Sequence, residues 1–373
     1  SVSWGDGVYK STDGGKTFKK VGLESSFQIG HIAIHPTNPD IVYVGALGQL
    51  WGDNEERGLY RTRDGGKSWQ QILYLDDKTG CIDVRLEPSN PDIVYAVMYE
   101  RKRDMYDGND PMTRFGAKAG IFKSSDGGDN FTRLTKGLPS CKWGRCAIEP
   151  WAKKPGTLFA LLETERSGWA RGDSVSRRAG AAYMGAGIAE HESGAQLSQI
   201  VKGSPAEKAG FKTGDIVVAM DATKIDSSDA FSENIDDHRS GDKVKVKILR
   251  EAKELELELT FGPRATTKNG PYSPRLGGQE GNRHKQQGDL GYQTGGVYRS
   301  DDFGETWTRL NSLIPRPFYF CSFTVDPNND QNIYVCGIQL WKSTNGGGRF
   351  SICNRDIHVD FHDVWVDPHD GSH

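Results

Sequence analysis

The octet STDGGKTF at residues 11–18 indicates the architecture of this chain, because it returns four more times. The copies are TRDGGKSW at 62–69, SSDGGDNF at 124–131, SDDFGETW at 300–307 and STNGGGRF at 343–350. A motif that recurs at such intervals is typical of repeat proteins. The interval between the third and fourth copies is far longer than the others, so we expect an inserted segment there.

A second motif lies between successive octets, as in HIAIHPTNPDIVYVG at 31–45 and DVRLEPSNPDIVYAV at 83–97. It predicts a strand, a proline turn and a second strand; a third strand, the octet and a fourth strand follow. Four short strands joined by turns form one blade of a β-propeller. We therefore predict a mainly β fold with four complete blades, at 31–72, 81–134, 146–310 and 321–353, and a partial blade at each end.

Each octet is predicted to be the turn between the third and fourth strands of its blade. Aspartate side chains accept hydrogen bonds from nearby N–H groups in such turns, and glycine supplies the positive φ. The terminal Trp or Phe is expected to pack between blades. The alternative is that the five positions bind ions or a ligand, but one copy has an asparagine. A structural role is therefore favoured for the five residues Asp13, Asp64, Asp126, Asp302 and Asn345.

The octets resemble the Asp-box, or bacterial neuraminidase, repeat of sialidases, some xyloglucan-degrading enzymes and sortilin-type receptors. The wider text, including NPDIVYVGALGQLWGDNEERGLYRTRDGGKSW, is similar to a bacterial family described as glycosyl hydrolase-like or sortilin-like. This resemblance implies a propeller fold and a periplasmic or extracellular location. Since the chain begins and ends inside a repeat, we expect it to be a fragment of a larger propeller rather than a five-bladed ring closed by its two ends.

Composition excludes some classes of partner. The 47 Lys and Arg against 50 Asp and Glu give a net charge of −3, which offers no electrostatic basis for binding nucleic acid. No apolar run is long enough for a membrane span, and no signal peptide is visible. The six cysteines have no paired CxxC spacing, so free thiols are favoured, although Cys321 and Cys336 could meet. We expect no required cofactor.

The insertion predicts a separate α+β domain at 183–262, between polar linkers at 165–182 and 263–295; propeller blades occupy 1–164 and 296–373. The stretch SPAEKAGFKTGD at 204–215 predicts a short helix that Ser204 caps, with Pro205 in its first turn. Lysines and glutamates alternate with apolar residues in DKVKVKILREAKELELELTF at 242–261, which predicts a hairpin with one charged face.

This segment resembles a bacterial PDZ domain of the kind found in periplasmic proteases, with YMGAGI at 183–188 as the carboxylate-binding loop. The resemblance implies capture of a protein C-terminus by backbone N–H groups and an exposed strand edge. The alternative is a groove that the rest of the chain blocks. The predicted peptide-binding residues are Tyr183, Met184, Gly185, Ala186, Gly187, Ile188, Phe231 and Ile235.

The repeats can be aligned on the proline that follows each first strand. The residues two and four positions before it are apolar or cysteine in every copy and are predicted to face the core. The residue five positions before it is polar in every copy, which predicts a ring near the propeller axis. The ring comprises His31, Asp83, Arg145, Ser322 and Asp363. It would bind a polar ligand such as a saccharide, or line a hydrogen-bonded, water-filled channel that contains an Asp83–Arg145 ion pair.

The segment HVDFHD at 358–363 alternates His358, Asp360 and His362, which an extended backbone would place on one face. These side chains would suit a divalent metal. We predict an extracytoplasmic binding or scaffold protein with C-terminal peptides or a polar saccharide as ligands. The alternative is a glycoside hydrolase in which Asp83 and Asp363 are the catalytic carboxylates.

Overall fold

The computed structural model describes residues 4–103, 112–167, 182–263, 278–354 and 357–371. These residues fall into two compact units. One unit contains the repeats and the other contains residues 182–263 with 285–288. The division shows that the inserted segment packs around a core of its own.

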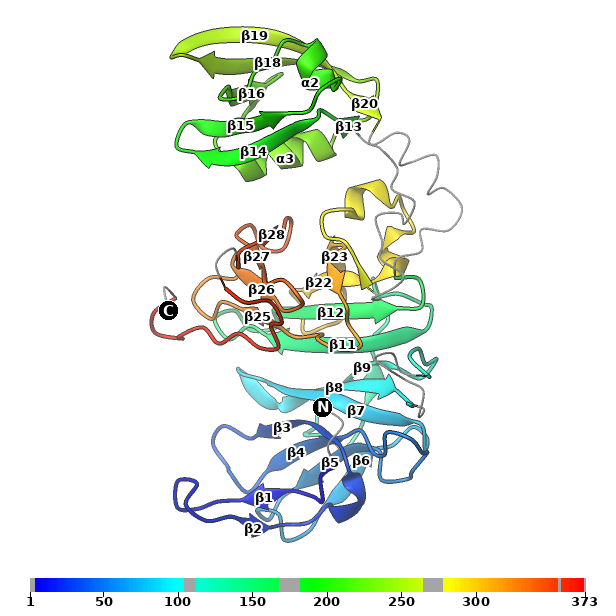
Figure 1. The fold of residues 1–373 in the computed structure, drawn as a ribbon. Coiled ribbons are helices and arrows are strands. Elements are labelled where there is room, and N and C mark those ends of the chain that lie inside the picture. The colour runs from blue at the N-terminus through cyan, green and yellow to red at the C-terminus, as the bar shows by residue number, and fades with distance from the viewer. Residues whose placement is uncertain (1–3, 104–111, 168–181, 264–277, 355–356, 372–373) are drawn as a thin grey trace. The chain divides into compact units, whose positions relative to one another are not determined.

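The repeat unit contains, in its described residues, four antiparallel sheets of four strands in sequential order (Figure 1). The first sheet is β3 (Ile29–Ile34), β4 (Val42–Ala46), β5 (Gly58–Thr62) and β6 (Gln70–Leu73), and the second is β7 (Thr79–Glu87), β8 (Asn90–Glu100), β9 (Gly120–Ser124) and β10 (Thr132–Arg133). The third is β11 (Trp143–Pro150), β12 (Leu158–Thr164), β22 (Gly296–Ser300) and β23 (Thr308–Asn311), and the fourth is β25 (Phe323–Val325), β26 (Ile333–Val335), β27 (Trp341–Ser343) and β28 (Ser351–Ile352).

Shorter elements complete this unit. They are the pair β1 (Tyr9–Lys10) and β2 (Lys19–Lys20), the pair β21 (Gly278–Gln279) and β24 (Ile314–Pro315), and the 3-10 turns η1 (Glu24–Ser26) and η3 (Gly291–Thr294). A third 3-10 turn, η2 (His284–Gln286), begins at the last residue of one stretch of this unit and continues into residues 285–288 of the other unit. The insertion leaves the chain after β12 and returns before β22, and these two strands pair directly, with Leu162 opposite Gly296. The third sheet is therefore continuous although its middle strands are far apart in sequence.

Each Asp-box aspartate closes its own turn. Asp64 accepts hydrogen bonds from the backbone N–H groups of Lys67 and Ser68 at 2.9 and 3.0 Å, and from the hydroxyls of Ser68 and Thr62 at 2.6 and 2.8 Å. Hydrogen bonds from the Ser68 side chain and backbone hold the pKa of Asp64 well below its usual range. The same pattern recurs at Asp13, Asp126, Asp302 and Asn345.

The box also ties the outer turn to the proline turn of the same sheet. The N–H of Gly65 donates to the carbonyl of Asp40 at 3.0 Å, and the N–H of Gly127 donates to Asp92 at 2.8 Å. Gly65 has a φ of 71°, a conformation that favours glycine. Phe303 takes the equivalent place in the fourth box at a φ of 58°, so the turn persists even where glycine is replaced.

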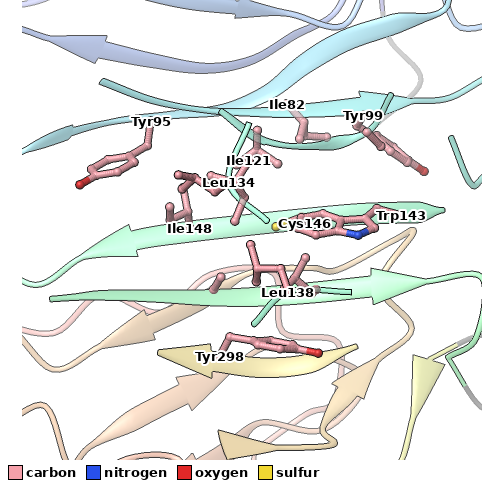
Figure 2. Close-up of a cluster of buried hydrophobic side chains, with 14 of the residues drawn as sticks. Ile82, Tyr95, Tyr99, Ile121, Leu134, Leu138, Trp143, Cys146, Ile148 and Tyr298 are labelled. Atoms are coloured by element: carbon pink, nitrogen blue, oxygen red, sulfur yellow. The ribbon is translucent and has the colours of Figure 1, made fainter. Parts of the chain in front are cut away.

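Apolar cores fill the spaces between neighbouring sheets. Figure 2 shows the one between the second and third sheets, where Tyr95 and Ile121 face Cys146, Ile148 and other side chains of the third sheet. Similar cores separate the first sheet from the second and the third from the fourth. The box aromatics contribute, as predicted: Trp307, Phe350 and Phe131 pack into these cores.

The residues two and four positions before the proline were predicted to face the core. This prediction is correct in the later copies and wrong in the first. Val84, Ile148 and Val325 are at most 1% exposed, whereas Ile32 and Ile34 are 41% and 61% exposed. These two side chains lie on β3, and the short β1–β2 pair does not cover them. Phe18, the aromatic of the first box, is 64% exposed. The sequence pattern identifies the apolar face, but only a neighbouring sheet buries it.

The second partial blade was also expected to begin with a strand at 363–368, and this prediction is wrong. No described residue from 357 to 371 lies in a strand. The segment is held by separate hydrogen bonds, such as that from the Thr324 hydroxyl to the carbonyl of Val364 at 2.7 Å. The first partial blade is present as β1 and β2.

The inserted unit has one antiparallel sheet, two helices and a short strand pair. The sheet order is β14 (Ala186–His191), β15 (Gly194–Ile200), β16 (Ile216–Met220), β18 (Lys243–Arg250) and β19 (Lys253–Thr260), and β17 (Thr223–Lys224) also pairs with β16. The helices are α2 (Pro205–Lys208) and α3 (Ser228–Asp236), and the pair is β13 (Ala182–Tyr183) with β20 (Gly262–Pro263).

Two local predictions for this unit are confirmed. The Ser204 hydroxyl caps α2 by accepting from the N–H of Glu207. The lysines of β18 and glutamates of β19 pair across the exposed face, for example Lys245 with Glu256 at 3.3 Å. Such exposed pairs contribute little to stability, so the charged rows mainly keep this face in water.

We predict that Asp64→Ala lowers the melting temperature of the chain by about 2–4 °C, because it removes a side chain that satisfies several donors of a turn. Differential scanning calorimetry checks this, with Asp64→Asn as the matched variant that keeps an acceptor, as Asn345 does naturally. An Asp64→Ala protein that melts at the wild-type temperature would contradict the structural role.

Candidate functional site

The inserted unit exposes a strand edge beside a helix. β14 pairs with β15 on one side only and forms the edge of its sheet. Helix α3 contacts both β14 and β15. A free strand edge next to a helix is the arrangement in which an extended peptide adds as a further strand.

The loop that leads into this strand has unused donors. The carbonyl groups of Met184 and Gly185 accept hydrogen bonds from the N–H groups of Ala206 and Val201, both at 2.9 Å. The N–H groups of the same two residues donate no hydrogen bond within the described part of the chain. The loop is thus fixed through its carbonyls and leaves two adjacent donors for an anion.

Glycine is required at the centre of this loop. Gly185 has a φ of 82°, and a Cβ atom there would lie 2.3 Å from the Cβ of Ser204. The close approach allows the loop to pack against the cap of α2. Any larger residue would push the two donors away from their present positions.

The predicted peptide-binding residues differ in burial. Phe231 and Met184 are buried in the core of the unit, and Ala186, Ile188 and Ile235 are partly buried against that core. Tyr183 lies in β13 opposite Gly262, and Gly187 lies at a bulge in the β14–β15 pairing.

In the repeat unit, two of the five polar ring residues, His31 and Asp83, bond from one sheet to the next. The ring Nδ1 of His31 lies 2.8 Å from the carbonyl oxygen of Val84, which joins β3 to β7. The N–H of Ile148 donates to Asp83 Oδ2 at 3.2 Å, which joins β11 to β7. These side chains therefore connect the first strands of successive sheets, which also contact one another.

The expected Asp83–Arg145 ion pair is not formed. Asp83 pairs with Arg85 at 3.1 Å, because residues two apart on a strand lie on the same face. Arg145 instead donates to the carbonyl of Tyr319 at 3.0 Å. Of the other two ring residues, Asp363 is exposed and accepts from its neighbour's N–H, while Ser322 accepts through its backbone carbonyl from the N–H of Cys336.

One residue that the sequence analysis missed is Glu149, which immediately precedes the proline of β11. Its Oε1 accepts a hydrogen bond from the N–H of Val325 at 3.3 Å, which joins β11 to β25. Desolvation raises the pKa of Glu149 to about 8, against the opposing charge of Arg85, and the charges of Asp83 and Asp363 add to the rise.

A signal for Glu149 was present in the alignment on proline. The residue just before the proline is polar in all five copies, namely His35, Glu87, Glu149, Asp326 and Asp367. Glu87 also bonds across a sheet boundary, since its Oε1 accepts from the N–H of Gly156 at 3.4 Å. Two of the five side chains, those of Glu87 and Glu149, therefore bond across a sheet boundary, whereas His35 and Asp326 accept hydrogen bonds within their own turns.

The predicted metal set is not assembled. Asp360 has a φ of 93°, so the backbone is not extended there and the alternation is broken. His362 Nε2 lies 3.6 Å from Asp360 Oδ1, while His358 Nδ1 lies 2.6 Å from the carbonyl oxygen of Val359. Among the described residues, no three His, Cys, Asp or Glu side chains are arranged to hold a metal ion. The six cysteines are free thiols.

Family models match three parts of this chain. Residues 6–177 match the sortilin, neurotensin receptor 3 model, residues 182–261 match the PDZ domain model, and residues 298–309 match the BNR/Asp-box repeat. The predicted fold class and resemblance are therefore confirmed. None of the helices in the described part of the chain has the length and apolar character that a membrane crossing requires.

Curated relatives match over a short stretch. A probable periplasmic serine endoprotease DegP-like from Chlamydia trachomatis is 40% identical over 67 residues, which is 18% of this chain and 14% of the relative. A serine protease Do-like HtrA from Bacillus subtilis is 40% identical over 67 residues, 18% of this chain and 15% of the relative. The chain thus spans about a seventh of these relatives.

A solved GH74 enzyme from Niastella koreensis aligns with 97% of this chain and 57% of its own, at 15% identity and a TM-score of 0.27. This likeness is too low to carry an argument about activity.

We predict that Glu149 makes stability fall as the pH rises. The pKa of Glu149 in the folded protein, about 8, lies above its ordinary value of 4.5. The stability that this difference gives the folded state is therefore fully present below pH 4.5 and is lost as the pH rises through 8. Chemical unfolding from pH 6 to pH 9 should show a shallower decline for Glu149→Gln than for the wild type. The exposed Glu55→Gln is the control; equal slopes in all three proteins would refute the prediction.

Proposed function

The chain combines a sortilin-type Asp-box propeller with an inserted PDZ domain, and we propose that it is an extracytoplasmic scaffold whose PDZ domain captures protein C-termini. The observation that carries this proposal is the loop at Met184 and Gly185, which presents two free N–H groups at the start of an open strand edge. A terminal carboxylate is the anion that fits such donors when the rest of the ligand is an extended peptide.

The neighbouring residues support a peptide rather than a free anion. A peptide that pairs with β14 would satisfy the strand's unpaired edge along its length. Its last side chain would lie against Ala186, Ile188 and Ile235, which are apolar and partly buried. The groove therefore suits a peptide with a small or medium apolar C-terminal residue.

A location outside the cytoplasm is supported by the relatives of the PDZ segment, whose names place them in the periplasm. The propeller would then provide a second surface. His31 and Arg85, which lie near the first strands, keep about a third of their side-chain surface exposed, and Asp363 is exposed. We propose that a polar ligand, such as a saccharide, binds at these exposed groups.

A glycoside hydrolase is the second candidate, and Glu149 is the observation that favours it. A glycosidase needs one carboxyl group that stays protonated and another that is ionised. Burial keeps the proton on Glu149 near neutral pH, and Asp83 and Asp363 are close enough for their charges to affect it. In this alternative Glu149 would be the acid, and Asp363 the base or nucleophile.

The peptide proposal predicts that the full chain binds peptides with an apolar C-terminal residue and a free carboxylate. Amidation of the same peptide should weaken binding about tenfold or more, because hydrogen bonds to a charged acceptor are lost. Fluorescence polarisation with labelled pentapeptides measures both affinities. Equal affinity for the amidated peptide, or no binding to either, would rule out C-terminal capture.

Two glycine variants test the loop itself. Gly185→Ala should abolish peptide binding, because the new Cβ would meet Ser204 and displace the donors. Gly203→Ala is the matched control, since Gly203 has a similar φ of 77° but no atom within 4 Å of the added Cβ. Equal loss in both variants would mean that backbone strain, and not the donors, explains the effect.

The glycosidase alternative predicts that the wild type releases reducing ends from a neutral polysaccharide such as xyloglucan. Glu149→Gln should then lower the rate about 100-fold or more, as expected for loss of a general acid. Glu55→Gln, an exposed residue of the same unit, should leave the rate unchanged. No release by the wild type across a panel of polysaccharides would remove this alternative.

A further inference from the structure

The far end of the peptide groove is bridged by one acidic residue. Glu190 is the fifth residue of β14, and Ser228 is the first residue of α3. The N–H of Ser228 donates to Glu190 Oε2 at 3.2 Å, and the Ser228 hydroxyl donates to the same oxygen. This contact joins the strand wall of the groove to its helix wall at the end opposite to the carboxylate loop.

The Glu190 carboxylate brings an unbalanced negative charge to this end of the groove. Its side chain is exposed, and no Lys, Arg or His of the described residues forms an ion pair with it. The helix beside it reads SDAFSENID and contains acidic residues but no basic one.

The register of β14 decides which peptide side chain reaches Glu190. Ala186 and Ile188 turn toward the core that α3 covers, and Glu190 follows Ile188 by two residues, so it lies on the same face. An added peptide strand has the same alternation. A peptide whose C-terminus lies at the loop before β14 would run antiparallel to this strand. If its last residue lies beside Ala186, the residue two positions before it would lie opposite Ile188, and the residue four positions before it would lie nearest Glu190 and Ser228.

We propose that the groove selects peptides that combine an apolar C-terminal residue with a Lys or Arg four positions before it, through the charge of Glu190. This inference rests on the proposed capture of C-termini and adds the class of partner. Because Glu190 already accepts two hydrogen bonds from Ser228, its carboxylate is held in place before a ligand arrives. A basic side chain at this position would meet a fixed charge and would need no rearrangement of the helix.

The test uses the full chain and three labelled peptides, Ala-X-Ala-Ala-Ala-Val with a free carboxylate and X as Lys, Gln or Glu. We expect the Lys peptide to bind about two- to fivefold more tightly than the Gln peptide, the range of an exposed ion pair, and the Glu peptide more weakly still. Raising the salt from 50 mM to about 0.5 M should reduce these differences.

Variants separate the charge of Glu190 from its contact with the helix. Glu190→Gln retains an acceptor for Ser228 and should bind the Lys and Gln peptides equally, and Glu190→Lys should prefer the Glu peptide. The control is Glu192→Gln, an exposed residue in the turn after β14 that should keep the wild-type order. Circular dichroism establishes that each variant is folded.

The outcomes distinguish failure of the charge selection by Glu190 from failure of C-terminal capture itself. If all three peptides bind the wild type with equal affinity, or if Glu190→Gln keeps the preference for Lys, the charge selection is wrong while C-terminal capture stands. If no peptide binds the folded wild type, capture itself is wrong, and the selection proposal fails with it.

Discussion

Every sheet of the repeat unit has two apolar faces, and each face needs a neighbouring sheet to cover it. This constraint explains why the chain repeats one four-strand unit and why the Asp boxes recur. The box holds the outer turn in place, so that its aromatic side chain, such as Trp307 or Phe350, enters the core shared with the preceding sheet. Where a covering sheet is missing, as at Ile32 and Ile34, the same pattern leaves apolar side chains in water.

The first strands of the sheets also depend on contact with a neighbouring sheet. They lie close together, and polar side chains such as His31, Asp83 and Glu149 bond to the backbone of the next first strand. These bonds satisfy N–H and carbonyl groups that would otherwise be buried without partners. The raised pKa of Glu149 is a consequence of this burial, and it is also what makes the glycosidase alternative chemically reasonable.

The inserted domain is compatible with this architecture because it enters between two strands that pair with each other. β12 and β22 keep their register across the insertion, so the third sheet keeps its hydrogen bonds. The domain has its own core around Phe231 and Val246. A scaffold built this way can present a peptide groove without altering the sheets that carry it.

Much of this organisation was predictable from the sequence. The Asp boxes, the proline turns and the Ser204 cap are local patterns with a direct physical cause, and the structure contains all of them. Contacts between residues far apart in the sequence were harder to predict. The Asp83–Arg85 pair could have been found from their spacing of two, but the bond from Val325 to Glu149 joins residues 176 apart. The positive φ of Asp360, which separates the predicted metal ligands, has no sequence signal.

The central claim is that the N–H groups of Met184 and Gly185 hold a terminal carboxylate. Amide NMR of the isotope-labelled full chain tests it most directly, because each N–H gives its own signal. Addition of a peptide ending in a free apolar residue should shift the Met184 and Gly185 signals most, followed by those of β14, while the signals of β19 stay unchanged. A bound peptide that leaves Met184 and Gly185 unshifted would contradict the account.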